Sequence, residues 1–324
     1  MNKLKYFIGP MSKNIVEAII EFCKETTNVI GLIPSRRQVE WDGGYVNNWT
    51  TKEFNQYAYI LPLQRDHAGP GQGDTDDDGY ESLKHDCQYL DLIHIDPWKK
   101  YPKYDEGLKW TIDMIKYCAS INPNIEYEVG TEESIRRFET EELYRLICDL
   151  RYELGNELFS KIKYLVIQSG TSLKGTSQTG HYDSERLKDM VILAKKYNLL
   201  SKEHNGDYIP VTVIQEKFNL GLDTINIAPE FGLIETQTYL DEIKDIELFE
   251  KYWQICYDSK RWVKWVNDEF EPHINKEELI KICGHYILSN PQFLSEIKSQ
   301  FPNIDNKIKT NITHKLNQLY GFTA

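Results

Sequence analysis

The chain has 324 residues, of which 40% are hydrophobic and 27% are charged, and its formal net charge is -12. This composition predicts a globular protein with a full hydrophobic core and excludes an intrinsically disordered chain. The acidic balance argues against nucleic acid as a partner, because binding to a phosphate backbone needs a basic surface.

Two further classes are disfavoured by simple patterns. No apolar run reaches the roughly 18 residues needed to cross a membrane, and the first residues lack the apolar stretch of a secretory signal peptide. We therefore expect a cytoplasmic protein with no membrane partner. Six cysteines occur singly, without the spacing of a zinc motif or the density of a disulfide scaffold, so we expect them to be reduced.

Short runs of β-branched and aromatic residues alternate with longer amphipathic stretches, which is the pattern of βα units that build a parallel sheet. The predicted strands are Tyr6–Gly9, Val29–Ile33, Tyr59–Leu63, Leu92–Ile95, Ile125–Val129, Tyr164–Ile167, Leu200–Glu203 and Thr224–Ile227. Eight βα units close into a (β/α)8 barrel, or TIM barrel. The first turn, Gly9–Ser12, lacks the glycine fingerprint of a dinucleotide-binding sheet, which disfavours that alternative.

Helical periodicity is clearest over Ser12–Cys23 and Ser184–Tyr197, and each of these stretches begins at a serine suited to cap a helix. After about residue 240 the strand signals stop, and the remaining sequence reads as helices separated at prolines. We therefore expect a barrel over residues 1–240. Residues 241–324 should form a helical extension that packs on the barrel or makes an oligomer contact.

Polar side chains gather at the ends of the predicted strands, where the active sites of such barrels form. Asp66 and His67 follow the third strand, Glu128 lies in the fifth, and His204 follows the seventh. Two histidines and several carboxylates on neighbouring strands suit a divalent metal with one position open to substrate. Asp66, next to an expected ligand, is the candidate general base.

These stretches resemble the class II, metal-dependent sugar aldolases. A closer resemblance is to the auxiliary, or non-catalytic, subunit family of tagatose-bisphosphate aldolase. The resemblance runs in order over roughly residues 6 to 240. The matching stretches are Ser35–Val39, Gly43–Tyr45, Arg65–Pro70, Ile93–Asp96, Glu128–Glu132, Gln168–Gly170, Glu203–Tyr208 and Asn226–Ala228.

The resemblance implies a barrel in which zinc, or another divalent metal, polarises the carbonyl of a ketose phosphate. A carboxylic acid then moves the protons as a carbon–carbon bond is cleaved or formed through an enediolate. By position in the family pattern, Asp66 would be the catalytic acid/base, and His67 and His204 would hold the metal.

The sequence departs from the family at two places. The histidine expected after the sixth strand is missing from Gly170–Gly175, so a third ligand must come from elsewhere, and His181 and Glu128 are the two candidates. If neither reaches the centre, we expect a site without metal. The glycine-rich phosphate turn after the seventh strand is replaced by Asn205–Tyr208, in which Asp207 would repel a phosphate.

An anionic group of the substrate would then bind elsewhere, and Arg36 and Arg37 after the second strand offer paired donors for it. The residues expected to bind substrate are Arg36, Gln38, Asp96, Gln168, Gly170, Thr171, Asp207 and Asn226. The expected ligand is a small anionic sugar, and we expect the chain to form a homo-oligomer.

Three functions fit these observations. The first is an aldolase acting on a sugar phosphate or a sugar-derived aldehyde in carbohydrate biosynthesis. The second is a non-catalytic subunit that stabilises a partner aldolase, which the missing histidine after the sixth strand favours. The third is a sugar epimerase or isomerase on the same barrel. We expect the first, because an acid buried beside two histidines is costly without a partner or a chemical role.

Overall fold

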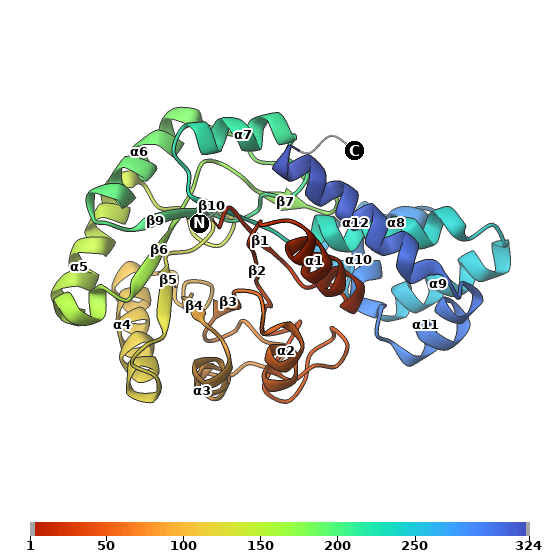
Figure 1. The fold of residues 1–324 in the computed structure, drawn as a ribbon, viewed down its shortest axis with the longest axis horizontal. Coiled ribbons are helices and arrows are strands. Elements are labelled where there is room, and N and C mark those ends of the chain that lie inside the picture. Colours follow the sequence, from red (N-terminus) through yellow and green to blue (C-terminus); the bar gives the residue numbers. More distant parts are fainter. Residues whose placement is uncertain (1–3, 322–324) are drawn as a thin grey trace.

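In the computed structural model, which describes residues 4–321, eight parallel strands form a nearly closed barrel surrounded by helices (Figure 1). This confirms the predicted (β/α)8 fold. The barrel strands are β1 (Tyr6–Ile8), β2 (Ile30–Leu32), β3 (Gln64–Ala68), β4 (Leu92–Ile95), β5 (Glu126–Val129), β6 (Ile162–Ile167), β9 (Leu200–Glu203) and β10 (Thr224–Ile227). Their order around the sheet is β2-β1-β10-β9-β6-β5-β4-β3.

The join between β2 and β3 differs from the other strand pairs, because only isolated bridges connect the two strands, Leu32 with Leu63 and Ser35 with Asp66. The buried Arg65 of β3 reinforces this join. Its Nη1 donates to the carbonyl of Val39 at 2.7 Å, on the β2 side. The rest of its guanidinium pairs with Asp86, which is also buried, so the charge of Arg65 is compensated.

The predicted third strand is wrong by several residues. Tyr59–Leu61 form a turn in which Tyr59 is 72% exposed, and the strand begins at Gln64. Gln64 and Arg65 are both fully buried with polar partners, Gln64 beside Glu128 and Arg65 beside Asp86, so an apolar pattern could not mark them as strand. The other seven predicted strands lie within two residues of the observed ones.

Twelve α-helices occur in the described residues. They are α1 (Lys13–Glu25), α2 (Thr51–Ala58), α3 (Tyr80–Tyr89), α4 (Tyr104–Ile121), α5 (Thr140–Phe159), α6 (Ser184–Lys196), α7 (Val211–Asn219), α8 (Pro229–Glu242), α9 (Ile246–Asp258), α10 (Lys276–Cys283), α11 (Pro291–Glu296) and α12 (Ile304–Tyr320). Ser12 caps α1 as predicted, accepting from the N–H of Ile15, whereas Asp183 caps α6 in place of the predicted Ser184. None of the helices within residues 4–321 is both long enough and apolar enough to span a bilayer.

The chain after α8 is helical and lies to one side of the barrel, and α12 then runs back along α1 and α8 (Figure 1). At its end the carbonyl of Leu319 accepts a hydrogen bond from Tyr6 in β1 at 2.8 Å. Three short 3-10 helices interrupt this part, over Val263–Trp265, Gly284–Ile287 and Lys298–Gln300. The division into a barrel and an extension near residue 240 stays a prediction.

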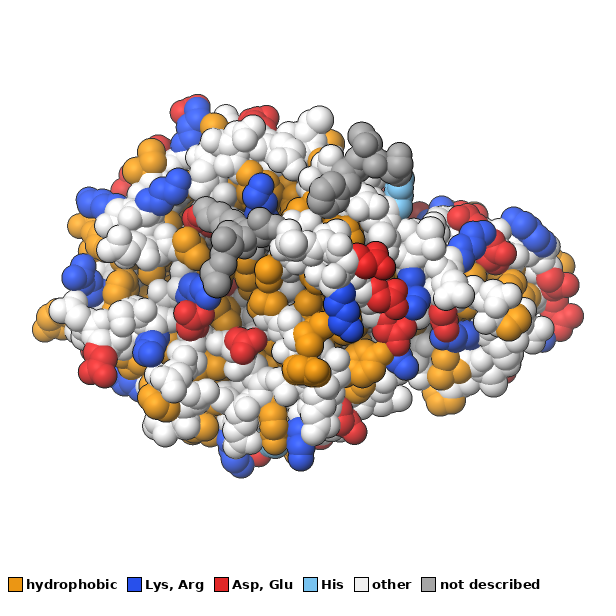
Figure 2. All heavy atoms as spheres, viewed as in Figure 1, with side chains coloured by type: hydrophobic (Ala, Val, Ile, Leu, Met, Phe, Trp, Pro, Cys, Tyr) orange, Lys and Arg blue, Asp and Glu red, His pale blue; other side chains and the backbone are white. Residues whose placement is uncertain are grey.

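On the face seen in Figure 2, lysine and arginine side chains are scattered among acidic and apolar ones. Basic side chains of the described surface also pair with acidic ones, as Lys309 of α12 does with Glu21 of α1 at 2.9 Å. The described residues of this face therefore present no basic stripe of the kind that follows a phosphate backbone.

Candidate metal centre

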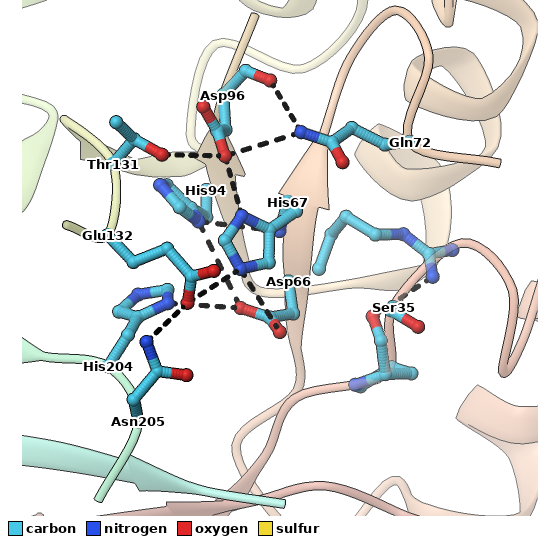
Figure 3. A network of polar contacts seen from close by, with 12 residues as sticks. Ser35, Asp66, His67, Gln72, His94, Asp96, Thr131, Glu132, His204 and Asn205 are labelled. Atoms are coloured by element: carbon cyan, nitrogen blue, oxygen red, sulfur yellow. Dashed lines mark hydrogen bonds and ion pairs between the residues drawn. The ribbon is translucent and has the colours of Figure 1, made fainter. Parts of the chain in front are cut away.

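Asp66 and His67 are neighbours in β3, where the pairing with β4 shifts register between Arg65 and Ala68. A register shift of this kind re-aims side chains. His67 also has a φ of 48°, a left-handed conformation that residues with a Cβ seldom adopt. The two consecutive side chains consequently point the same way, toward His94 and His204 (Figure 3).

Four side chains converge at the carboxyl end of the barrel: Asp66, His67, His94 and His204. One nitrogen or oxygen atom from each lies within 4.8 Å of the corresponding atoms of the other three. Oδ1 of Asp66 is 3.9 Å from Nδ1 of His94 and 3.8 Å from Nδ1 of His204. Oδ2 of Asp66 is 3.8 Å from Nε2 of His67.

Each imidazole has one ring nitrogen anchored to an oxygen outside the group. The pairs are His67 Nδ1 with Asp96 Oδ2 (2.6 Å), His94 Nε2 with the carbonyl of Gly130 (3.0 Å) and His204 Nε2 with Glu128 Oε1 (2.6 Å). In a neutral ring such an anchor holds the proton, so the lone pair of the other nitrogen is directed into the group. This is the arrangement found around metal-binding histidines. In His94 this lone pair, on Nδ1, also accepts a hydrogen bond from the backbone N–H of His67 at 3.3 Å.

The two anchoring carboxylates are ionised. Burial acts to raise the pKa of Asp96, but the hydrogen bond and charge of His67 hold it below its usual value. Burial opposes ionisation of Glu128 too, but the charges of Lys202, His94 and His204 hold its pKa well below the usual range. The ammonium of Lys202 lies 2.9 Å from Glu128 and, like Glu128, is fully buried.

The field at the group favours a cation. Burial works against protonation of His67, yet the charges of Asp66, Asp96 and Glu132 raise its pKa to about 10. The neighbouring carboxylates therefore stabilise a positive charge at His67, whereas burial lowers the pKa of His94 and favours its neutral form.

Unsatisfied polar atoms mark the same region. Oδ1 of Asp66 and both side-chain polar atoms of Asn226 are buried and have no hydrogen-bond partner within residues 4–321. Leaving such atoms unpaired is unfavourable, so a ligand is expected to contact them. Three imidazoles with an adjacent carboxylate are a donor set that fits Zn²⁺ or a similar divalent ion.

A cavity of about 330 Å³ opens from this group to the surface. Its wall includes Asp66, His67, His204 and Asn226, which are residues of the barrel strands and of the loops that follow them. Residues 264, 265, 285 and 286, from the helical part of the chain, also line it. The cavity is thus shared between the barrel and the segment that follows α8.

The predicted metal ligands fall into two sets. His67 and His204 lie in the group, whereas Glu128 stands behind His204 as its hydrogen-bond acceptor. His181 is exposed and lines a different cavity, in the segment that follows the hairpin of β7 (Leu173–Lys174) and β8 (Ser177–Gln178).

Sequence reasoning missed His94 as a ligand, since it lies within an apolar strand. The available signal was the alternation of a strand, which places His94 and Asp96 on one face of β4.

Three of the predicted substrate-binding residues line the cavity: Gln38, Asp207 and Asn226. Burial, followed by the charge of Glu230, raises the pKa of Asp207 to about 8, although backbone N–H groups, including that of Ala228, donate to its carboxylate. The expected repulsion of a phosphate by Asp207 is therefore weak near neutral pH.

The other predicted substrate residues make internal contacts. Asp96 lies beneath His67, and Gln168 bonds backbone atoms including the N–H of Phe138 at 2.8 Å. Gly170 and Thr171 line the cavity that contains His181.

Arg36 is buried and is fully engaged by its neighbours. Its guanidinium contacts Glu40 at 2.6 Å, both carboxylate oxygens of Asp77 at 2.7 Å and the carbonyl of Gly69 at 3.0 Å. The structure therefore gives Arg36 a role in holding the loop after β3, because its donors are already satisfied.

No protein-family model matches the sequence, and no curated protein matches it. Solved structures do match along most of the chain. A probable tagatose 6 phosphate kinase from Sinorhizobium meliloti 1021 is 14% identical and has a TM-score of 0.76, with 98% of this chain and 100% of that chain covered. The YdjI aldolase from Escherichia coli K12 is 11% identical with a TM-score of 0.53, covering 91% of this chain and 93% of that chain.

The fructuronate-tagaturonate epimerase UxaE from Cohnella laeviribosi is 10% identical, with a TM-score of 0.61 and coverage of 99% of this chain and 82% of that chain. At these identities the likeness shows the fold. The chain therefore has a barrel of the kind found in sugar-processing enzymes, among them aldolases and an epimerase.

Proposed function

We propose that this chain is a metal-dependent enzyme of the class II aldolase type, in which His67, His94 and His204 hold Zn²⁺ or another divalent ion. The observation that carries the proposal is that all three rings are held in the same way. Each ring has one nitrogen bonded to an oxygen outside the group, and its other nitrogen faces Asp66. Such an ion would polarise the carbonyl of a sugar and stabilise negative charge on its oxygen.

Asp66 is the proposed acid/base. Its Oδ1 is buried, has no hydrogen-bond partner in the described residues, and faces the centre at which the three rings meet. From there it can take a proton from a hydroxyl or carbon next to the sugar carbonyl and return it. In an aldolase this proton transfer accompanies cleavage or formation of a carbon–carbon bond.

An epimerase or isomerase is the second candidate, because proton abstraction next to a carbonyl needs the same groups. The likeness in fold to UxaE, over 99% of this chain, supports the epimerase as a candidate. The resemblance to the auxiliary subunit of tagatose-bisphosphate aldolase leaves a non-catalytic function as the alternative, against which the converging histidines count. A cytoplasmic location and a homo-oligomeric state accompany the proposal as expectations.

Elemental analysis of protein purified without added metal or chelator tests the proposal, with His94→Ala as the variant and His181→Ala as the matched control. We expect near-stoichiometric metal in the wild type and in His181→Ala, and loss of metal in His94→Ala. Wild-type protein without metal, and without rebinding on titration, would argue for the auxiliary function. Product analysis on ketose phosphates and sugar aldehydes then separates an aldolase from an epimerase.

A further inference from the structure

Three basic side chains line the cavity that contains Asp66 and His67: Arg37, Lys99 and Lys264. They come from three separate parts of the chain. Arg37 follows β2, Lys99 follows β4, and Lys264 belongs to the 3-10 helix Val263–Trp265 beyond the barrel. The same cavity is also lined by the carboxyl groups of Asp66, Glu132 and Asp207, so the three cations stand beside the acidic groups of the proposed metal centre.

The donors of these side chains are largely unused. Nε of Arg37 lies 3.3 Å from the carbonyl of Gly73 and 3.4 Å from Asp74, whose two carboxylate oxygens are already bound by Arg261 at 2.8 Å each. Within residues 4–321, no hydrogen bond or ion pair engages the two terminal nitrogens of Arg37 or the amine of Lys264. The ammonium of Lys264 lies over the rings of Trp265 and Tyr286, at 4.5 and 5.6 Å from their centroids, and these contacts leave its N–H donors unused.

Lys99 has a single partner for its ammonium, the carbonyl of Gly71 at 3.1 Å. Arg36 provides the contrast within the same turn, because every part of its guanidinium is paired. The unused donors at Arg37, Lys99 and Lys264 are therefore a property of this cavity and do not extend to the neighbouring arginine.

The three cations also repel one another. The side chain of Lys264 is exposed overall, but loss of water around its ammonium, followed by the charges of Arg37, Lys99 and Arg261, lowers its pKa to about 8. Loss of water and the charge of Arg37 likewise lower the pKa of Lys99. Like charges held together in this way are stabilised when an anion binds between them.

We propose that Arg37, Lys99 and Lys264 form a subsite for an anionic group of the substrate, a phosphate or a carboxylate, while its carbonyl end reaches Asp66. The proposal deepens the proposed function and rests on it for the identity of the site. A cavity of about 330 Å³ suits a ligand of sugar size. The anion would then bind at Arg37 and Lys264, rather than at the predicted Arg36, Gly170 and Thr171.

The test is calorimetric titration of the full-length protein with inorganic phosphate and, separately, with acetate. The variants are Lys264→Gln and Arg37→Gln, with Lys264→Arg to retain the charge. Lys103→Gln serves as the matched control, because Lys103 is exposed and lies outside the cavity. Each titration is run before and after removal of metal by a chelator. Anion binding at the subsite can then be measured even if the protein holds no metal.

We expect saturable binding that is about tenfold or more weaker in Lys264→Gln and Arg37→Gln and near wild type in Lys264→Arg and Lys103→Gln. Stronger binding of phosphate identifies a phosphorylated sugar as the ligand class, and stronger binding of acetate identifies a sugar acid. Absence of saturable binding, equal binding by Lys264→Gln and Lys103→Gln, or binding that disappears with the metal would overturn the subsite.

Discussion

Glu128 accepts a hydrogen bond from Nε2 of His204 at 2.6 Å, and the same carboxylate is paired with the buried ammonium of Lys202 at 2.9 Å. Because Glu128 is ionised, it has no proton to donate, and the proton of a neutral His204 must lie on Nε2. Nδ1 of His204 therefore keeps its lone pair toward Asp66. Glu128 thus sets the orientation of a proposed ligand without being one.

Glu128→Gln should weaken metal binding by about 10- to 100-fold, since an outer partner of a ligand is lost. It should also lower the free energy of unfolding by about 3 kcal/mol, because Lys202 is left buried without a counter-charge. Metal titration and urea unfolding measure the two effects. Lys217→Met is the control, because it breaks another buried pair, Lys217 with Glu203 at 2.5 Å, whose carboxylate is also bonded by Ser169 and Thr171 and by none of the three rings. Equal metal affinity in both variants would contradict the role of Glu128.

Asp66→Asn should reduce turnover by about 100-fold or more, since general acid–base catalysis contributes that much or more. The fold and the metal content should be unchanged, because the amide has nearly the same shape and Oδ1 of Asp66 has no hydrogen bond to lose. Steady-state kinetics and elemental analysis on one preparation check both parts. Loss of metal would make Asp66 a ligand, and an unchanged rate would exclude it from the reaction.

Arg36 and Arg37 should differ sharply in their effect on stability. Arg36→Met leaves the buried Glu40 and the loop carboxylate of Asp77 without their partner, and we expect a loss of about 3 kcal/mol in the free energy of unfolding. Arg37→Met should change that free energy by less than about 0.5 kcal/mol, because Arg37 makes only long contacts. Urea unfolding of the two variants side by side makes the comparison, and similar losses would refute it.

Glu235 of α8 should make stability depend on pH. Burial raises its pKa from 4.5 to about 7, although Ser12 and Asn14 donate to it. The folded protein then holds a proton that the unfolded chain releases above pH 4.5. The resulting stabilisation is complete below that pH and is lost as the pH rises through about 7.

Glu235→Gln mimics the protonated acid, so it should gain up to about 3 kcal/mol of stability relative to the wild type between pH 4.5 and pH 8. Urea unfolding of both proteins across this range gives the difference at each pH. A difference that stays constant would mean that Glu235 titrates normally in the folded protein.

The barrel could be predicted from the sequence because most of its strands, such as β1 and β6, are rich in apolar residues, which a parallel sheet buries. The third strand could not be placed, because Gln64 and Arg65 are buried through polar pairing that only the folded structure creates. His94 could not be recognised as a ligand because it lies among the apolar residues of β4. Its neighbours Ile93 and Ile95 point to the other face of the strand, away from the centre that His94 faces.

Only part of the cavity wall could be predicted from the sequence: Asp66, His67 and His204 could be placed there, and Lys264 could not. His181 and Lys264 both lie in segments that connect larger elements, and no local pattern says where such a segment runs. In the structure His181 lines a separate cavity, whereas Lys264 lines the cavity that contains Asp66. Whether each residue reaches the cavity depends on how segments far apart in the sequence pack together, which only the folded structure shows.

The barrel should open locally more easily between β2 and β3 than between its other neighbouring strands. Along every other pair of neighbouring barrel strands a ladder of hydrogen bonds must separate, whereas here the described backbone offers isolated bridges and the side chain of Arg65. Amide hydrogen exchange should therefore be fastest along this line, through local openings far smaller than global unfolding. Asp66 forms one of these isolated bridges. The strand pair that carries the proposed acid is therefore also the pair expected to open locally most often.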